Sequence, residues 1–427
     1  LAILEYFNYG RYGEIVMGYG EETFRQFQPT AVYPPYTSEA EQLLAHNDTH
    51  RITVDDGRGD QNPEFLLHPN GEQFTLENTF RGGDTVTNLT GVMSYRNDAY
   101  KVQPNGTGAD YEATNPRPEV PELGGSMQVA SFNVLNYFTT LDARGANTPE
   151  ELERQQTKIV AAIVEMDADV VGLIEIENNG DEAVGTLVDA LNEAAGAGTY
   201  DFVSTGVIGT DEITTAFIYQ PAAVTPVGDF AILTEDDDPR FLDSKNRPTL
   251  AQTFEENATG ERVTVANNHL KSKGSSCDDV GDPEDPWAGN CNGVRTDAAE
   301  AMVDWLAGDP TGQGTDNILV IGDLNSYDKE DPIEVFLDAG YSDLLLDFGE
   351  GEFDYSYVFD GQLGYLDYAL ASEGLLDNVV DAASWKINAD EPSVLDYDMT
   401  FKPDEQDALY EPNAYRSSDH DPVLVGL

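Results

Sequence analysis

Five short polar segments stand at the ends of predicted β-strands, and each holds a side chain able to bind a metal ion or a phosphate. The segments are residues 131–133, 173–175, 267–269, 322–325 and 418–420. In α/β proteins the loops at strand ends carry the functional side chains, and a rigid scaffold positions them. Five such segments in one chain therefore predict an α/β domain with a single site assembled from distant parts of the sequence.

The pattern of apolar residues divides the chain into two domains. Residues 1–115 contain short alternating runs separated by Gly, Asn and Asp, which is typical of an all-β domain. Residues 116–126 are rich in Pro and Gly and are predicted to be a linker. Over residues 127–427 apolar strands alternate with helices, the first of which opens with a capping box at 148–151. In this second domain we expect helices to cover stacked sheets.

The charge of the chain is strongly negative. Eighty acidic residues stand against 22 basic ones, only eight of which are Lys, and the net charge is −58. One interpretation is a device for solubility, and the other is adaptation to high salt, where about 1 M salt shortens the Debye length to roughly 3 Å and makes the self-repulsion tolerable. The scarcity of Lys favours a halophilic or marine source. No run of 18 apolar residues occurs, so we expect no membrane-spanning helix and no membrane partner.

The two cysteines flank a polar, acidic loop. Cys277 and Cys291 have too few thiols or His side chains near them for a zinc site. A disulfide between them would close a loop of about 15 residues and contribute on the order of 3 kcal/mol. Such a bond implies an oxidising compartment, so we expect a secreted protein whose leader has been removed before Leu1.

Two of the polar segments hold carboxylate groups together with Asn or His. Asp323 and Asn325 follow an apolar strand two positions apart, so both side chains face the same side and are able to orient water and a phosphate oxygen. Asp419 and His420 precede the last strand, and a His with a pKa near neutrality is the natural acid/base group. Asp367 begins another strand, where a hydrogen bond to a His nitrogen would compensate its burial. Taken singly, each segment is also compatible with an ordinary turn.

A local concentration of positive charge follows the strand that ends at His269. The candidate substrate contacts in and around this region are Arg247, Lys271, Lys273 and Arg295, with a solvated loop as the alternative. Glu175 ends a strand predicted to be buried, a position that is hard to explain without a cation. Mg²⁺ commonly takes one or two carboxylates, so Glu175 is a candidate ligand.

Together the segments resemble the endonuclease/exonuclease/phosphatase superfamily over residues 127–427, and most closely the secreted bacterial nucleases of the ExeM type. The resemblance rests on residues 129–138, 172–180, 267–274 and 355–362 and on the Cys pair. It implies a four-layer α/β sandwich, with two packed β-sheets flanked by helices. It also implies that the first domain is a small all-β OB-like domain, which is a candidate for binding nucleic acid.

The resemblance further implies roles for the site residues. The metal ligands would be Asn133, Glu175 and Asp419. The water and the phosphate would be oriented by Asp323 and Asn325, and the acid/base and phosphate-contacting groups would be His269 and His420, the latter paired with Asp367. Arg247 falls where the family has a phosphate-contacting Arg.

Two positions depart from the pattern of pancreatic deoxyribonuclease. That enzyme has a Glu that supports its first catalytic His, and here the matching stretch offers Asp211 or Glu212. It also has a DNA-contacting Arg two positions after the metal-binding Glu, and here Glu177 stands at that place. We therefore do not expect the side chain at position 177 to contact a groove of DNA.

The sequence as a whole predicts a secreted, salt-tolerant and monomeric nuclease that depends on Mg²⁺ or Mn²⁺. It would hydrolyse DNA, and RNA as a second substrate, with little sequence preference, and leave 5′-phosphate and 3′-hydroxyl ends. Endonuclease and exonuclease action both stay open. The alternatives are a phosphoesterase acting on lipid or inositol phosphates, and a non-catalytic nucleic-acid-binding protein. The acidic loops at 55–56, 278–285 and 328–331 are candidates for structural Ca²⁺ sites.

Overall fold

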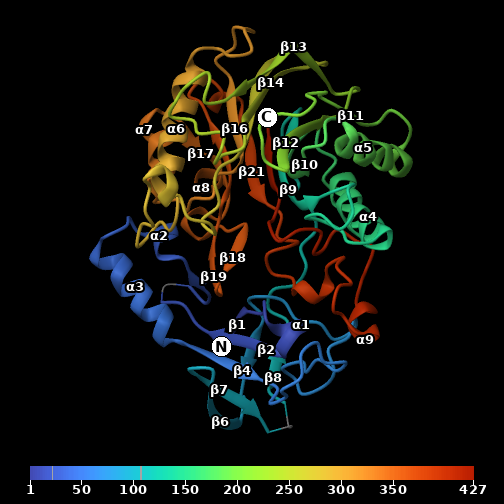
Figure 1. The fold of residues 1–427 in the computed structure, drawn as a ribbon, viewed down its shortest axis with the longest axis vertical. Coiled ribbons are helices and arrows are strands. Elements are labelled where there is room, and N and C mark those ends of the chain that lie inside the picture. Colours follow the sequence, from blue (N-terminus) through green and yellow to red (C-terminus); the bar gives the residue numbers. More distant parts are fainter. Residues whose placement is uncertain (22, 106–107) are drawn as a thin grey trace.

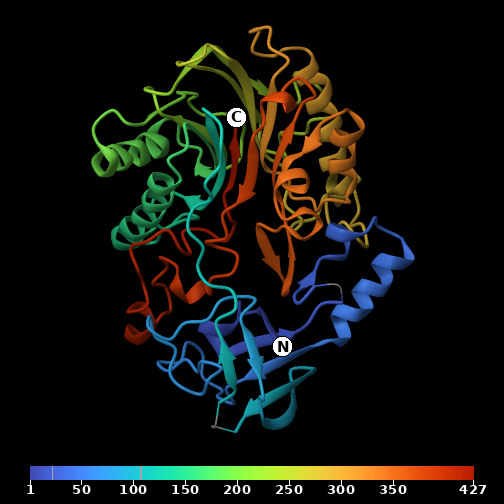
Figure 2. The same cartoon turned by 180° about the vertical axis from the view of Figure 1, so that it is seen from behind.

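The computed structural model describes residues 1–21, 23–105 and 108–427, which form a β-rich N-terminal region and a larger mixed α/β region. Figure 1 shows the N-terminal region below the α/β region, and Figure 2 shows the same arrangement from behind. The β-rich part ends at residue 112, and the mixed α/β part begins at residue 128. Among the described residues, no helix combines the length and the apolar character needed to cross a membrane.

The N-terminal region is built on one seven-stranded sheet. Its strands, in spatial order, are β6 (Gly91–Arg96), β7 (Ala99–Pro104), β4 (Arg51–Asp55), β2 (Glu14–Gly18), β1 (Ala2–Glu5), β5 (Thr85–Thr87) and β8 (Asp110–Glu112). The pairing of β4 with β7 is parallel, and the other pairings are antiparallel. Tyr9, Phe74 and Phe80 pack edge to face in its core. Its helices are α1 (Tyr9–Tyr12), α2 (Pro29–Val32) and α3 (Ser38–Thr49).

The α/β region contains two six-stranded sheets. The first has the order β11 (Asp201–Phe202), β12 (Ile213–Tyr219), β10 (Val170–Glu177), β9 (Gln128–Tyr137), β22 (Val423–Gly426) and β21 (Asp381–Ser384). The second has the order β13 (Val224–Leu233), β14 (Thr249–Glu256), β15 (Arg262–His269), β16 (Ile318–Asp323), β20 (Asp367–Ala371) and β17 (Ser342–Asp343). Buried residues of both sheets, among them Val170 and Leu319, belong to one apolar core. The two sheets therefore pack face to face.

Helices cover the outer faces of the two sheets (Figure 1). On the first sheet lie α4 (Pro149–Met166) and α5 (Glu182–Ala195), and on the second lie α6 (Asn292–Ala307) and α7 (Asp331–Asp338). The short helix α8 (Leu344–Phe348) contacts β21 of the first sheet as well as β20 and β17 of the second. The predicted capping box begins α4, where the Thr148 side chain accepts from the N–H of Glu151 and the Glu151 carboxylate accepts in return. Ile159, Ile163 and Leu187 join the strands in a second apolar core.

Strand register brings the ends of the central strands together. In the second sheet, β15 and β16 run parallel with His269 opposite Asp323, and β16 and β20 run antiparallel with Asp323 opposite Asp367. In the first sheet, β9 and β10 run parallel with Asn133 opposite Ile174, next to Glu175. Residues as far apart in the sequence as Asn133 and Asp367 therefore lie at one end of the sandwich.

The N-terminal region is fastened to the α/β region by a shared sheet and by buried ion pairs. Strand β3 (Gln26–Phe27) pairs in parallel with β19 (Gln362–Gly364), which forms a hairpin with β18 (Tyr357–Phe359). Arg25 and Arg81 pair with Asp390 and Glu391 at 2.8 and 2.7 Å, and all four side chains are buried or nearly so. Residues 113–126, which include the predicted linker, carry no regular secondary structure. A short helix, α9 (Asp404–Asp407), precedes the loop that leads to β22.

Candidate active site

The strand ends of both sheets, together with the loop before β22, form a cluster of acidic and His side chains. Asn133 and Glu175 come from the first sheet, Asp419 and His420 come from the loop, and three members come from the second sheet: His269, Asp323 and Asp367. All are buried except Glu175 and Asp419, which are half-buried. All five polar segments seen in the sequence thus meet with the head of β20 at one place.

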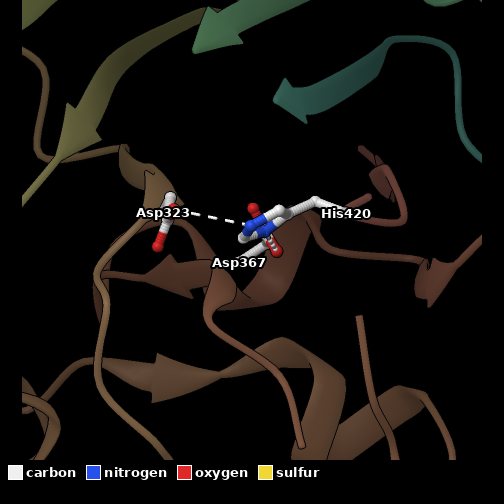
Figure 3. Close-up of side chains that lie close together, drawn as sticks. All are labelled: Asp323, Asp367 and His420. Carbon is white, nitrogen blue, oxygen red and sulfur yellow. Dashed lines mark hydrogen bonds and ion pairs between the residues drawn. The ribbon is translucent and has the colours of Figure 1, made fainter. Parts of the chain in front are cut away.

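His420 is held by Asp367. Its Nδ1 lies 2.8 Å from Asp367 Oδ2 (Figure 3), and the same oxygen accepts a 2.6 Å hydrogen bond from the Ser356 hydroxyl. The Tyr357 ring stacks on the imidazole with 4.5 Å between ring centroids. Burial by itself would lower the pKa of His420, but the charge and hydrogen bond of Asp367, with the charges of Asp419 and Asp323, raise that pKa well above its ordinary value. Its surroundings therefore favour protonation of His420, whose Nε2 faces Asp323.

Asp323 lies between the two His side chains. Its Oδ2 is 3.7 Å from Nε2 of His269 and 4.0 Å from Nε2 of His420, and its Oδ1 accepts from the N–H of Asn325 at 2.8 Å. Burial raises the pKa of Asp323 to about 7, with the charge of His420 opposing the rise and that of Asp367 adding to it. The carboxyl group can thus change its protonation state near neutral pH.

His269 differs electrostatically from His420. Burial, followed by the positive charge of Arg247, lowers the pKa of His269 well below its ordinary value. Its Nε2 lies 3.9 Å from Glu175 Oε1, and its buried Nδ1 has no hydrogen-bond partner among the described residues. The pKa of His269 is thus shifted down and that of His420 up, and such a divergence suits a base and an acid in the same site.

A bulge aims Glu175 into the site. Its φ is +65°, and the pairing of β10 with both neighbours shifts register between Ile174 and Ile176. Such a conformation costs on the order of 1–3 kcal/mol in a non-Gly residue and clusters at functional sites. Burial raises the pKa of Glu175, and the charge of Asp419 raises it further. The backbone is thus strained at Glu175, and this conformation places its carboxylate next to that of Asp419.

The cluster fits a divalent cation. The sequence pointed to Asn133, Glu175 and Asp419 as ligands, whereas one ligand atom from each of Asp323, Asp367 and His420 lies within 4.8 Å of the other two. In this second set His420 and Asp367 already bond each other. Within the described part of the chain, no Lys or Arg pairs with Glu175, Asp323 or Asp419, so nothing on the protein balances these acids directly apart from the His side chains. Acids in this arrangement are stabilised by a bound cation.

The predicted substrate contacts fall into two groups. Arg247 lies beside the site and pairs with Asp211 at 3.1 Å, and Lys271 is half-buried with its ammonium in no ion pair among the described residues. Lys273 instead binds both oxygens of the buried Glu330 at 2.6 Å. Asn325 turns its amide nitrogen to the carbonyl of Leu270 at 3.1 Å.

Arg295, which the sequence suggests as a substrate contact, lies inside the protein. The side chain is fully buried, and its guanidinium donates to the Ser326 hydroxyl and to the carbonyls of Ala288, Asn290 and Lys271. It therefore fixes the loop that the disulfide closes. That predicted disulfide, Cys277–Cys291, is present with 5.2 Å between the Cα atoms.

The two departures noted in the sequence also have structural explanations. Asp211 does not support His269, because its carboxylate pairs with Arg247 and Arg144. Glu177 accepts from the backbone of residues 139 and 140 and from the Asn179 amide, so it braces the loop after β9. In the acidic loops, carboxylates accept backbone N–H groups, as Asp55 and Asp285 do, or pair with Lys, as Asp328 does. These loops are thus folded through protein contacts.

Sequence reasoning missed three residues that shape the site. Ser356 and Tyr357 hold Asp367 and His420 from the β18–β19 hairpin, and Arg416 lies with Asp419 on the wall of a neighbouring cleft. The stretch 355–362 contributed to the family resemblance, but nothing in its pattern indicates contact with the last loop of the chain. The only feature of the sequence that could have drawn attention to this stretch is Ser356 between Tyr355 and Tyr357.

A known protein family matches the larger region. The model of the endonuclease/exonuclease/phosphatase family matches residues 130–420, whereas no curated protein matches the chain significantly. Among solved structures, the human Nocturnin catalytic domain with bound sulfate is 16% identical, with 71% of this chain and 95% of that chain covered and a TM-score of 0.46. A Bacteroides thetaiotaomicron mannosyl-6-phosphatase is 17% identical (70% and 98% covered, TM-score 0.46), and D. rerio TDP2 complexed with single-strand DNA product is 15% identical (70% and 97% covered, TM-score 0.44).

The family model spans more than half of the chain, and its ends coincide with β9 and with the loop that carries His420. It therefore covers every strand end that contributes to the cluster. The chain belongs to the endonuclease/exonuclease/phosphatase family.

Proposed function

We propose that this phosphoesterase is a secreted, monomeric nuclease that hydrolyses phosphodiester bonds of DNA, and secondarily of RNA, with little sequence preference. The observation that carries the proposal is the placement of two His side chains on either side of Asp323, with their Nε2 atoms 3.7 and 4.0 Å from its Oδ2. Hydrolysis of a diester needs one group to take a proton from water and another to protonate the leaving oxygen. His269 and His420 are suited to these two tasks.

Each residue of the cluster has its own role in the proposed hydrolysis. Asp323 orients the attacking water, and neutral His269 takes its proton at Nε2. His420, held by Asp367, donates the proton on its Nε2 to the leaving 3′ oxygen, so the products carry a 5′-phosphate and a 3′-hydroxyl. Asn133, Glu175 and Asp419 would hold the divalent cation, Mg²⁺ or Mn²⁺, which stabilises negative charge on the phosphate when bound. Arg247 and Lys271 supply positive charge beside the phosphate.

The N-terminal region supports nucleic acid as the substrate class. Its strand order β1-β2-β4-β7-β6, with β4 and β7 parallel, resembles that of an OB-like domain. Its outer hairpin exposes the neighbouring rings of Tyr95 and Tyr100, 4.9 Å apart. Exposed aromatic rings are platforms for bases. The disulfide favours an oxidising compartment, in agreement with secretion.

The first experiment is incubation of the purified protein with closed circular plasmid DNA, with Mg²⁺ or with EDTA, beside the His420→Ala variant. Nicking that is lost with EDTA and with the variant supports a metal-dependent endonuclease. An intact circle, with digestion once the DNA is linear, supports an exonuclease. Release of phosphate from sugar or inositol phosphates without cleavage of either DNA form would overturn the proposal in favour of a phosphatase.

A further inference from the structure

A cleft of about 360 Å³ lies between the N-terminal region and the α/β region, next to the cluster of acids and His side chains. The loop after β1 supplies Tyr6 and Phe7, and the β18–β19 hairpin supplies Tyr357 and Phe359. The cleft reaches Asp419, and the Tyr357 ring that lines it stacks on His420. It is therefore a continuation of the active site that exists only because the two regions dock.

The acids of this cleft are already bound to protein groups. Glu5 accepts from the N–H groups of Tyr6, Phe7 and Gly361 at 2.6 to 2.9 Å. Asp360 pairs with Arg51 at 2.9 Å. Apart from Asp419, the negative charges on the wall are thus engaged away from any ligand.

Arg416 is the one cation on the wall. Its Nη1 donates to the carbonyl of Asn388 at 3.0 Å, and its buried Nε has no hydrogen-bond partner among the described residues. Among the residues that the structure describes, Arg416 also forms no ion pair, although acidic residues outnumber basic ones by 80 to 22. An unpaired guanidinium in such an acidic protein attracts an anion.

Two aromatic side chains at the cleft are left open to solvent. Phe7 is 77% exposed and Phe359 is 60% exposed, and they stand on the two sides of the junction. Large apolar side chains that meet around a cleft mark a binding surface rather than ordinary surface. An anion site beside exposed aromatic rings matches a nucleotide, whose phosphate is negative and whose base is flat and apolar on its faces.

We propose, on the basis of the function proposed above, that this cleft binds a nucleotide adjacent to the scissile phosphate, with its base stacked on Phe7 and Phe359 and its phosphate on Arg416. A base in a duplex is stacked on its neighbours and paired, so it cannot enter. The cleft thus selects a single-stranded or unpaired stretch of nucleic acid.

The test is binding and cleavage by a Phe7→Ala/Phe359→Ala double variant. Binding is followed by fluorescence anisotropy in EDTA, and cleavage with Mg²⁺, for a single-stranded DNA oligonucleotide, the same sequence as a duplex, and the same strand with abasic positions. Both side chains are largely exposed, so the variant is expected to fold. Phe348→Ala, at the end of α8 and outside the cleft, is the matched control. Arg416→Gln tests the phosphate contact separately.

The expected result is a loss of about tenfold in Kd and KM for the single strand, the effect of losing one stacked base. The loss should be clearly smaller for the abasic strand and for the duplex, and Phe348→Ala should match the wild type. Equal losses for single strand and duplex, or none, would overturn the cleft proposal while leaving nuclease activity standing. Selective binding without cleavage of any DNA would instead overturn the proposed function and leave the cleft as a binding site.

Discussion

Replacement of Lys158 by Met should make the protein more stable at pH 6 and should lose that advantage as the pH rises. Lys158 lies on α4 and is almost fully buried, with its Nζ donating to the carbonyl of Tyr415 at 2.7 Å. Burial, and after it the charge of Arg117, lowers the pKa of Lys158 from 10.5 to about 7. The charges of Asp396, Glu391 and Glu411 oppose this shift and do not overcome it. The side chain fastens the loop that leads to the active site, but it does so at a cost in free energy.

The magnitude follows from the difference between the folded and unfolded pKa values. Below pH 7 the ammonium is charged in both states, and its burial costs the folded state up to about 5 kcal/mol. Between pH 7 and 10.5 the unfolded chain binds more protons than the folded one, so wild-type stability rises with pH in that window. Lys158→Met removes the penalty but leaves the Tyr415 carbonyl without a donor, which costs about 1–3 kcal/mol. The variant should therefore be more stable by up to about 2–4 kcal/mol at pH 6.

The assay is urea unfolding of both proteins at pH 6, 7, 8 and 9 in one fixed high salt concentration. Other titrating groups cancel in the difference between the two free energies of unfolding. From about pH 7 upward this difference should fall by up to about 1.4 kcal/mol for each pH unit. Lys402→Met is the matched control, because that Lys pairs with Asp396 at 2.7 Å and its removal should bring no gain. A difference that does not change with pH, or a variant that is less stable at pH 6, would refute the reasoning.

Three further predictions concern catalysis, salt and docking. Asp367→Asn should lower kcat on DNA by about 10²- to 10⁴-fold because His420 loses its charged partner. Ser356→Ala removes only a hydrogen bond to Asp367 and should lower kcat by about tenfold. An unchanged kcat in Asp367→Asn would contradict the role proposed for the Asp367–His420 pair. Nuclease activity should rise with salt over the low range and persist near 1 M because salt screens the net charge of −58, and a monotonic fall from about 50 mM upward would count against this. Asp390→Asn should cost about 3–5 kcal/mol in urea unfolding because Arg25 and Arg81 lose a buried partner, and an unchanged midpoint would show that these pairs do not hold the two regions together.

The strand-end residues were accessible from sequence because a buried strand has a recognisable apolar run and ends abruptly at a polar residue. His269 and Asp323 each end such a run, and parallel pairing then sets them side by side. The contact of Asp367 with His420 was likewise expected from the cost of a buried, unpaired carboxylate. In these cases local pattern and simple energetics were sufficient.

Residues whose role depends on remote loops were not accessible in this way. Lys273 and Arg295 looked like surface cations, yet Glu330 and a set of backbone carbonyls from other loops enclose them. Tyr357 contacts His420 only because the β18–β19 hairpin packs between the two regions. No periodicity in the sequence encodes the position of that hairpin, since it depends on the pairing of β3 with β19.

The acidity of the chain and the aromatic cleft have a common physical explanation. Contacts between Lys or Arg and phosphates weaken steeply as salt rises, because the gain from counterion release is lost. A protein with 22 basic residues, many of them tied into ion pairs such as Arg25–Asp390 and Arg240–Asp304, has little charge to spare for such contacts in any case. Stacking of a base on Phe7 or Phe359 is apolar in origin, and salt does not screen it. If high salt is the working condition, binding through exposed rings and the one cation on the cleft wall, Arg416, is the mode that keeps its affinity there. The loss caused by Phe7→Ala/Phe359→Ala should then be as large at about 1 M salt as at low salt, whereas the loss caused by Arg416→Gln should shrink.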